Sequence, residues 1–283
     1  MNTRLIQDSE VEQRVFEAIQ FITFNLDPNI KPILDKAYLN EQDPLAKDVL
    51  TSIITNIGLA KTNLIPLCQD TGTLVVFAEL GNRVLIEGKT LEQAINKALA
   101  RATETCYLRA TVLSDPLFNR VNLGTNLPAI VHTKIVEGSE LHLHIAQKGG
   151  GAENMSRLKM FNPSACPQDI IDYVVETVSL AGSKACPPLI VGVGIGGNFE
   201  QCALLAKKAL FVDIYANHPD PSYRDMEKDM LIAINETKIG AQGMGGNLTA
   251  LAVHIMTAPC HIASLPVAVN LQCHSHRHLA ITI

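Results

Sequence analysis

Residues 187–214 read PPLIVGVGIGGNFEQCALLAKKALFVDI, and this stretch gives the strongest indication of the fold class. An apolar run typical of a buried strand leads into a glycine cluster, GVGIGG (192–197). A helix-like segment follows the glycines and ends in LFVD, whose last residue is Asp213. A strand, a glycine turn and a helix in succession predict an α/β arrangement.

The same stretch contains a possible nucleotide site. Gly192, Gly194 and Gly197 satisfy GxGxxG, which dinucleotide-binding folds place between a strand and a helix. Such folds also use an acidic residue further along, and Asp213 comes slightly too early for that role. No clean run of further strand–helix units follows. An NAD-dependent oxidoreductase therefore stays a remote alternative.

Other segments extend the mixed pattern. Residues 9–25 show the apolar periodicity of an amphipathic helix, and Thr90 with Gln93 forms a capping box that opens another helix. Residues 129–136 and 140–146 alternate apolar and polar side chains around a glycine, which predicts a β-hairpin. We therefore expect a mixed α/β (α+β) fold, with a β-sheet surrounded by helices.

Length and composition limit the classes of protein. A chain of 283 residues with 47% hydrophobic and 18% charged residues can bury a large core, and we expect one domain over residues 1–283. The net charge of −5 and the lack of a long basic run argue against nucleic acid as a partner. The N-terminal residues carry acids where a signal peptide is apolar, and no apolar run approaches the roughly 20 residues of a membrane helix.

The cysteines suggest a reducing compartment. An odd number of cysteines without a signal peptide predicts reduced thiols in the cytoplasm. No two of them form a CxxC pair, so a zinc ribbon is not indicated. The seven are Cys68, Cys106, Cys166, Cys186, Cys202, Cys260 and Cys273.

A thiol and a carboxylate also lie together in PLCQDTG (66–72), just before a strand-like run. One interpretation is a tight turn with a buried thiol, and the other is a metal ligand beside an acid–base group.

Glycine-rich loops recur at KGGGAENMS (148–156), GVGIGG and GAQGMGG (240–246). Such loops let main-chain N–H groups approach an anion closely, and three of them favour backbone contacts with a ligand over simple turns.

Four blocks in order carry a family resemblance. They are PLCQDTG, KGGGAENMSRLKMFNPS (148–164), ACPPLIVGVGIGG (185–197) and the C-terminal GAQGMGGNLTALAVHIMTAPCHIASLPVAVNLQCHSHRH (240–278). Together they resemble the iron–sulfur (class I) fumarate hydratases, in the alpha subunit or the equivalent N-terminal half. The resemblance extends from about residue 60 to residue 278, and four ordered blocks are far more specific than any single motif.

The resemblance implies a [4Fe–4S] cluster held by three of the seven cysteines, Cys68, Cys186 and Cys273. Their spacing alone cannot select them, but thiolates are the usual ligands of such clusters. Three protein ligands for four irons leave one iron open to substrate, as a Lewis acid requires. The remaining cysteines are expected to have structural roles.

The resemblance also implies roles around the open iron. Asp70 and His261 are the expected catalytic groups and would share a proton. The expected substrate-binding residues are Gln69, Arg109, Gly149, Gly150 and Gly151. Three of these assignments have structural alternatives: Asp70 could cap its own turn, His261 could be a hydrogen-bonded core residue, and Arg109 could form a surface ion pair.

The expected reaction is the reversible hydration of fumarate to (S)-malate. The block GGGAENMSRLKMFNPS looks more like fumarases than like the related L-tartrate dehydratases, whose substrate is the alternative. Single-chain family members continue into a second domain, so we expect a beta subunit as partner, in a dimer of alpha–beta units. Small departures at Leu123, Ala241 and after Arg109 concern substrate positioning rather than the cluster.

Overall fold

A four-stranded sheet in the order β10-β5-β2-β4 forms the centre of one unit of the chain in the computed structural model, which describes residues 3–283. Strand β2 runs parallel to β4 and antiparallel to β5, and β10 pairs with the other side of β5. A separate parallel pair joins β1 to β3. The bounds are β1 Arg4–Gln7, β2 Thr73–Gly81, β3 Val84–Glu87, β4 Ile130–Val136, β5 Leu141–Lys148 and β10 His278–Thr282.

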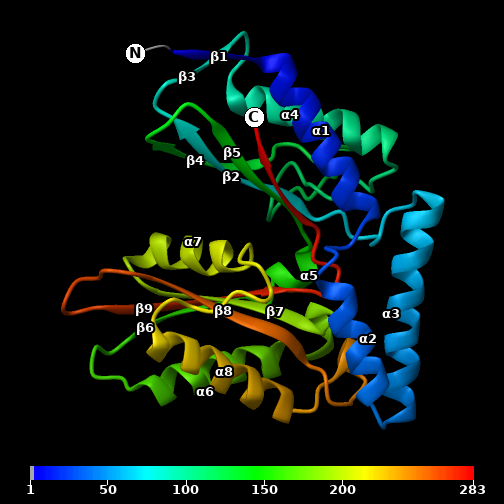
Figure 1. Cartoon of the computed structure of the whole chain (residues 1–283), viewed down its shortest axis with the longest axis vertical. Coiled ribbons are helices and arrows are strands. Elements are labelled where there is room, and N and C mark those ends of the chain that lie inside the picture. Colours follow the sequence, from blue (N-terminus) through cyan, green and yellow to red (C-terminus); the bar gives the residue numbers. More distant parts are fainter. Residues whose placement is uncertain (1–2) are drawn as a thin grey trace. The chain divides into compact units, whose positions relative to one another are not determined.

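Helices α1 (Asp8–Phe24) and α4 (Leu91–Thr105) cover one face of this sheet (Figure 1). Both bury an apolar stripe in a core shared with β2 and β5, so burial of apolar area stabilises the layer. The predicted helix at 9–25 is confirmed. The capping box is also confirmed: Gln93 N donates to Thr90 Oγ1 at 3.3 Å, and Thr90 N donates to Gln93 Oε1 at 3.1 Å.

The predicted hairpin is wrong, although both of its strands exist. Strands β4 and β5 do not pair with each other, because β2 lies between them. Residues Leu74–Ala78 of β2 are buried, so this strand belongs in the sheet interior with a neighbour on each side. Alternation of side chains identified the strands, but it contains no information about which strand is the neighbour.

The second unit contains a four-stranded sheet in the order β6-β9-β7-β8. Strand β7 is parallel to β8 and antiparallel to β9, and β6 pairs with β9. Helix α7 lies on one face, and α6 and α8 lie on the other (Figure 1). The bounds are β6 Arg157–Phe161, α6 Pro167–Ala181, β7 Leu189–Gly196, α7 Phe199–Ala209, α8 Pro221–Glu236, β8 Ala250–Ala258 and β9 Leu265–Gln272.

The described chain also contains three further α-helices, α2 (Ile30–Asn40), α3 (Pro44–Asn63) and the short α5 (Gly150–Glu153), and 3-10 turns at Gly182–Ala185 and Ala241–Gly243. The described chain passes between the two units after Asp27, Thr55, Gly150 and His276, so separated segments build each unit. The predicted α+β class is confirmed. The single-domain organisation stays a prediction. Among residues 3–283, no helix combines the length and the apolar character needed to cross a membrane.

The GxGxxG glycines have a packing role. A Cβ at Gly192 would lie 2.1 Å from the carbonyl oxygen of Ala206, and one at Gly194 would lie 2.2 Å from that of Cys202. Both contacts are with α7, so the missing side chains let this helix approach β7. The acidic residue expected at a strand end is not there: the described chain forms no strand between α7 and α8, and Asp213 accepts a hydrogen bond from Asn29.

Gly194→Ala is therefore expected to destabilise the chain by about 3 kcal/mol, because the new Cβ overlaps the α7 backbone. Gly58→Ala is the matched control. Gly58 is exposed in α3 with nothing near its Cβ position, and the change should raise the free energy of unfolding by about 0.5–1 kcal/mol. Urea unfolding of both variants measures the difference, and equal stabilities would contradict the packing role.

Candidate functional site

The CQDTG turn lies in the first unit, between α3 and β2. The Cys68 sulfur, half-buried, accepts a hydrogen bond from the backbone N–H of Asp70 at 3.4 Å. Gly72 has a φ of 69°, and a Cβ there would lie 2.1 Å from the carbonyl oxygen of Lys148. Only glycine fits this position, so the turn has a fixed shape against the end of β5.

The Asp70 carboxylate is held by backbone donors on both oxygens. Gly72 N donates to Oδ1 at 2.9 Å, and Gly150 N donates to Oδ2 at 2.8 Å. The turn thus brings Asp70 together with Gly149 and Gly150. Each oxygen keeps a lone pair for a proton or a substrate hydroxyl. Part of the structural alternative also holds, because the Gly72 bond does shape the turn.

Arg109 follows α4 and lies in the same unit. Two residues further on, Thr111 Oγ1 donates to the carbonyl oxygen of Gly72 at 3.2 Å, so this segment runs beside the CQDTG turn. Arg109 and Gln69 are both exposed. Across residues 3–283, Arg109 makes no ion pair, so its guanidinium is available to bind a carboxylate.

Cys186 and Cys273 lie at one end of the second unit's sheet. Cys186 precedes β7 in a left-handed conformation (φ 53°, ψ 62°), and Cys273 directly follows β9. The antiparallel register pairs Ile190 with Gln272, which places the start of β7 beside the end of β9. Cys186 is exposed and Cys273 is 8% exposed. Two thiols distant in sequence therefore share one edge of the sheet.

His274 and Gln242 connect these two cysteine segments. The His274 backbone N–H donates to the carbonyl oxygen of Cys186 at 3.4 Å, and its ring Nδ1 lies 3.1 Å from the same oxygen. Gln242 donates to the carbonyl oxygen of Pro187 from its backbone N–H at 2.8 Å and from Nε2 at 3.0 Å. Gln242 Nε2 is also 3.0 Å from His274 Nδ1. When Nδ1 is unprotonated it accepts this hydrogen bond, and when Nδ1 carries the proton it donates to the carbonyl oxygen of Cys186 instead.

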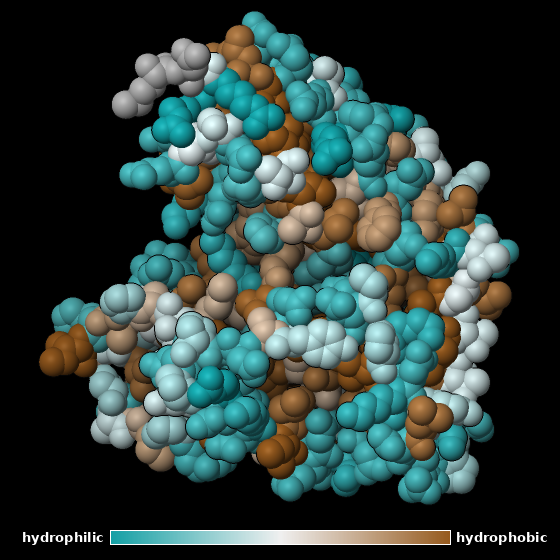
Figure 2. Space-filling model, viewed as in Figure 1, coloured by the Kyte–Doolittle hydropathy of each residue, from teal (hydrophilic) through white to brown (hydrophobic). Residues whose placement is uncertain are grey.

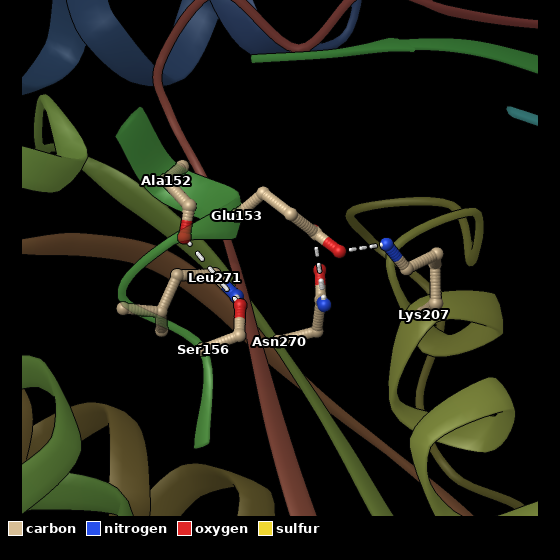
Figure 3. A network of polar contacts seen from close by, with 6 residues as sticks. All are labelled: Ala152, Glu153, Ser156, Lys207, Asn270 and Leu271. Atoms are coloured by element: carbon tan, nitrogen blue, oxygen red, sulfur yellow. Dashed lines mark hydrogen bonds and ion pairs between the residues drawn. The ribbon is translucent and has the colours of Figure 1, made fainter. Parts of the chain in front are cut away.

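A second polar network holds the glycine loop at 148–156 (Figure 3). The Glu153 carboxylate points toward Lys207 on α7 and Asn270 on β9; it pairs with the Lys207 ammonium and accepts from Asn270 Nδ2 at 3.2 Å. Ser156 Oγ accepts from Leu271 N at 3.2 Å. These contacts fix α5 on the strand that leads to Cys273. A Cβ at Gly151 would lie 2.9 Å from the carbonyl oxygen of Lys184, so the loop also lies close to the Cys186 segment.

The remaining cysteines are in structural positions. Burial raises the pKa of the Cys202 thiol to about 11 and also raises that of Cys106, which opposes the thiolate form that binds metal. Cys166 is the N-cap residue of α6. Cys260 donates to the carbonyl oxygen of Ser264 at 3.3 Å. None of the seven is in a disulfide, and among residues 3–283 no three His, Cys, Asp or Glu side chains already form a metal-binding group.

His261 is not at the cysteine end of the second unit. It is exposed in the β8–β9 loop, where its Nδ1 accepts from the Ala263 N–H at 3.1 Å. The neighbouring Ile262 is 91% exposed, and Figure 2 shows a hydrophobic group at the tip of this loop. The eight residues of β9 separate this loop from Cys273, a distance of about 26 Å along an extended strand. The structural alternative of a core histidine is wrong, because the side chain is exposed.

Three residues with contacts near the predicted site residues have no role assigned from the sequence: Gln242, His274 and Arg277. Nothing in the block that ends in NLQCHSHRH distinguishes His274 or Arg277 from their neighbours. Gln242 adopts a φ of 54°, which is unusual for a residue other than glycine. No pattern in the sequence signals that conformation, because it depends on the carbonyl of Pro187 from a distant segment.

Comparisons with known proteins show the family of the chain. Residues 12–282 match the sequence model of the family described as fumarate hydratase (Fumerase). A provisionally named L(+)-tartrate dehydratase subunit alpha of Methanocaldococcus jannaschii is 38% identical over 274 residues, covering 95% of each chain. The L(+)-tartrate dehydratase subunit alpha of Escherichia coli K12 is 31% identical over 239 residues, covering 84% of this chain and 78% of that one. The chain therefore belongs to the fumarate hydratase (Fumerase) family of hydro-lyases, as a member of its alpha-subunit type.

Proposed function

We propose that this chain is the alpha subunit of a [4Fe–4S]-dependent hydro-lyase that reversibly hydrates fumarate to (S)-malate. The observation that carries the proposal is the pair Cys186 and Cys273 at one end of a sheet, on segments joined through His274. Cys186 is exposed, so it is not simply a core residue. The hydrogen bond from His274 to the carbonyl oxygen of Cys186 also holds the two cysteine segments together, as a shared ligand site requires.

The donor set fits the cluster. Cys68, Cys186 and Cys273 would supply three thiolates, the soft ligands that iron–sulfur clusters use. The Asp70 N–H already donates to the Cys68 sulfur, and such bonds to ligand sulfurs are one means by which a protein tunes a cluster. When bound, the cluster supplies a Lewis acid at its open iron for the hydroxyl and one carboxylate of the substrate.

The chain's own residues supply the other functions. Asp70, fixed by Gly72 and Gly150, can take a proton from water during hydration and return it during dehydration. Arg109 can bind a substrate carboxylate through two parallel hydrogen bonds, which fixes the orientation of the carbon chain. Gln69 and the backbone of Gly149, Gly150 and Gly151 can donate to the remaining oxygens.

L(+)-tartrate is the second candidate substrate, and the names of two relatives favour it. Tartrate carries a second hydroxyl group on the same four-carbon dicarboxylate skeleton. Dehydration of either substrate needs the same groups, namely an acid–base residue, a carboxylate receptor and a metal. The two candidates therefore differ in how the pocket receives one extra hydroxyl.

A beta subunit would complete the site, as the term alpha in the relatives' names suggests. We also propose a dimer of alpha–beta units. Within one chain, β9 separates His261 from Cys273, so His261 can act near the cysteine end of this sheet only from a second copy. The sharing of a proton between His261 and Asp70 stays a prediction. We also propose a cytoplasmic location, because an odd number of cysteines is typical of a reducing compartment.

Anaerobic co-expression with a beta-like chain tests the function. The purified complex should show broad visible absorption that is bleached in air, and it should hydrate fumarate. Relative kcat/KM values for malate and L(+)-tartrate decide between the two candidates. Turnover of neither substrate by a cluster-loaded complex, or full turnover by this chain without a partner, would contradict the proposal.

A further inference from the structure

Arg277 is one of the largest side chains that the fold buries completely, with 1% of its surface exposed. It precedes β10, and its Nη1 donates to Gln147 Oε1 at 3.3 Å. In the described chain, Nε and Nη2 have no hydrogen-bond partner, and the guanidinium forms no ion pair. A buried cation is stable only when an anionic or strongly dipolar group compensates its lost hydration.

The unbonded end of Arg277 faces the Asp70 turn. A Cβ at Gly149 would lie 3.2 Å from Asp70 Oδ2 and 3.8 Å from Arg277 Nη2. The carboxylate and the guanidinium therefore lie on the border of the same small space, which exists because Gly149 has no side chain. Asp70 is thus the carboxylate that borders the Gly149 space together with this guanidinium, and Gly150 N donates to the same Oδ2 atom at 2.8 Å.

The other side of Arg277 is fixed by a buried hydrogen-bonded chain. Gln147 N donates to the Arg277 carbonyl oxygen at 3.1 Å, and Gln147 Nε2 donates to Thr23 Oγ1 at 3.0 Å. Thr23 Oγ1 in turn donates to the carbonyl oxygen of Ile19 within α1 at 2.7 Å. Gln147 and Thr23 are each 1% exposed. The guanidinium is thus held by Gln147 of β5, which α1 fixes in turn through Thr23.

We infer that Arg277 is a positioning residue that orients the Asp70 carboxylate across the space left by Gly149. Its charge attracts the carboxylate from the buried side, while Gly72 and Gly150 hold it through their backbone N–H groups. A water molecule in the Gly149 space can connect Nη2 with Oδ2, since both border it. This inference rests on the proposed function for the role of Asp70 in proton transfer, but the placement of the two charged groups around Gly149 is independent of that role.

A double-mutant cycle on the full chain in its complex tests this coupling. Arg277→Met keeps an unbranched apolar stem and removes the charge, and it should lower kcat about a hundredfold with little change in KM, because a misplaced acid–base group slows the chemical step. Arg277→Lys should recover part of this loss. In the Asp70→Asn background, Arg277→Met should lower kcat less than about threefold further, because the group it positions is already absent.

The matched control is Arg101→Met, which removes an exposed guanidinium that packs on Phe16 of α1. It should leave kcat unchanged, and its effects should add to those of Asp70→Asn. Equal losses of kcat from Arg277→Met in both Asp70 backgrounds would overturn the inference, because a purely structural role would act independently of Asp70.

Thermal unfolding separates this inference from the proposed function. The Tm values of Arg277→Met, Asp70→Asn and the double variant should be non-additive, with the double variant losing several degrees less than the two single losses together. If the complex turns over no substrate while the Tm values are non-additive, the proposed function fails and the coupling between Arg277 and Asp70 stands. Additive Tm shifts would overturn the coupling whatever the activity.

Discussion

Cys186→Ser is expected to reduce turnover of the alpha–beta complex by at least about a hundredfold and to remove most of its visible absorption. Even residues that only support a metal ligand are worth roughly 10–100-fold in affinity or activity, and loss of a ligand itself should cost at least as much. A serine hydroxyl is a harder donor than a thiolate and suits iron–sulfur clusters poorly. Anaerobic purification, followed by absorption spectra and fumarate hydration, measures both effects.

Cys166→Ser is the matched control, because Cys166 also precedes a proline but begins helix α6. Serine is a preferred N-cap residue, so this variant should keep the cluster, the turnover and the stability of the chain. Full activity of Cys186→Ser would show that Cys186 is not a ligand. Equal damage from both changes would show that the assay reports general loss of thiols instead.

Two inactive variants are expected to restore each other's activity when combined in one dimer. His261→Ala and Cys186→Ser should each be nearly inactive as homodimers. Because β9 separates His261 from the cysteine end of its own unit, a site at that end would need the loop of a second copy. In a mixed dimer one site then contains both intact residues and the other contains both changes. The mixed dimer should therefore show about half of the wild-type turnover.

Differently tagged alpha chains, co-expressed with the beta subunit and purified through both tags, provide the mixed species. Each homodimer, purified in parallel, sets the background. If His261 acted within its own chain, each chain of the mixed dimer would carry one defect and no activity would return. Full activity of His261→Ala alone would remove the residue from the mechanism.

The elements that the sequence predicted correctly depend on local chemistry. The capping box of Thr90 and Gln93 lies within one helical turn, and the strands at 130–136 and 141–148 show alternation in their own residues. Pairing was not predictable in the same way. Both strands pair with β2, which lies far earlier in the chain. The alternation of apolar and polar side chains along a strand does not indicate which other strand it pairs with. The GxGxxG glycines were ambiguous for a related reason, since the helix that needs their space is visible only in the packed unit.

The same distinction between local chemistry and contacts of distant segments holds for the candidate site. By itself, the sequence determined the chemical groups: the CQDTG turn, the glycine loops, the seven cysteines and the four ordered blocks that indicate a hydro-lyase. Only the tertiary structure decided which groups meet. It joined the Cys186 and Cys273 segments through His274, buried Arg277 beside Asp70, and separated His261 from Cys273 by the length of β9. Residue types fix the available chemistry locally, whereas distances between remote segments depend on strand pairing and core packing, which no short stretch of sequence contains.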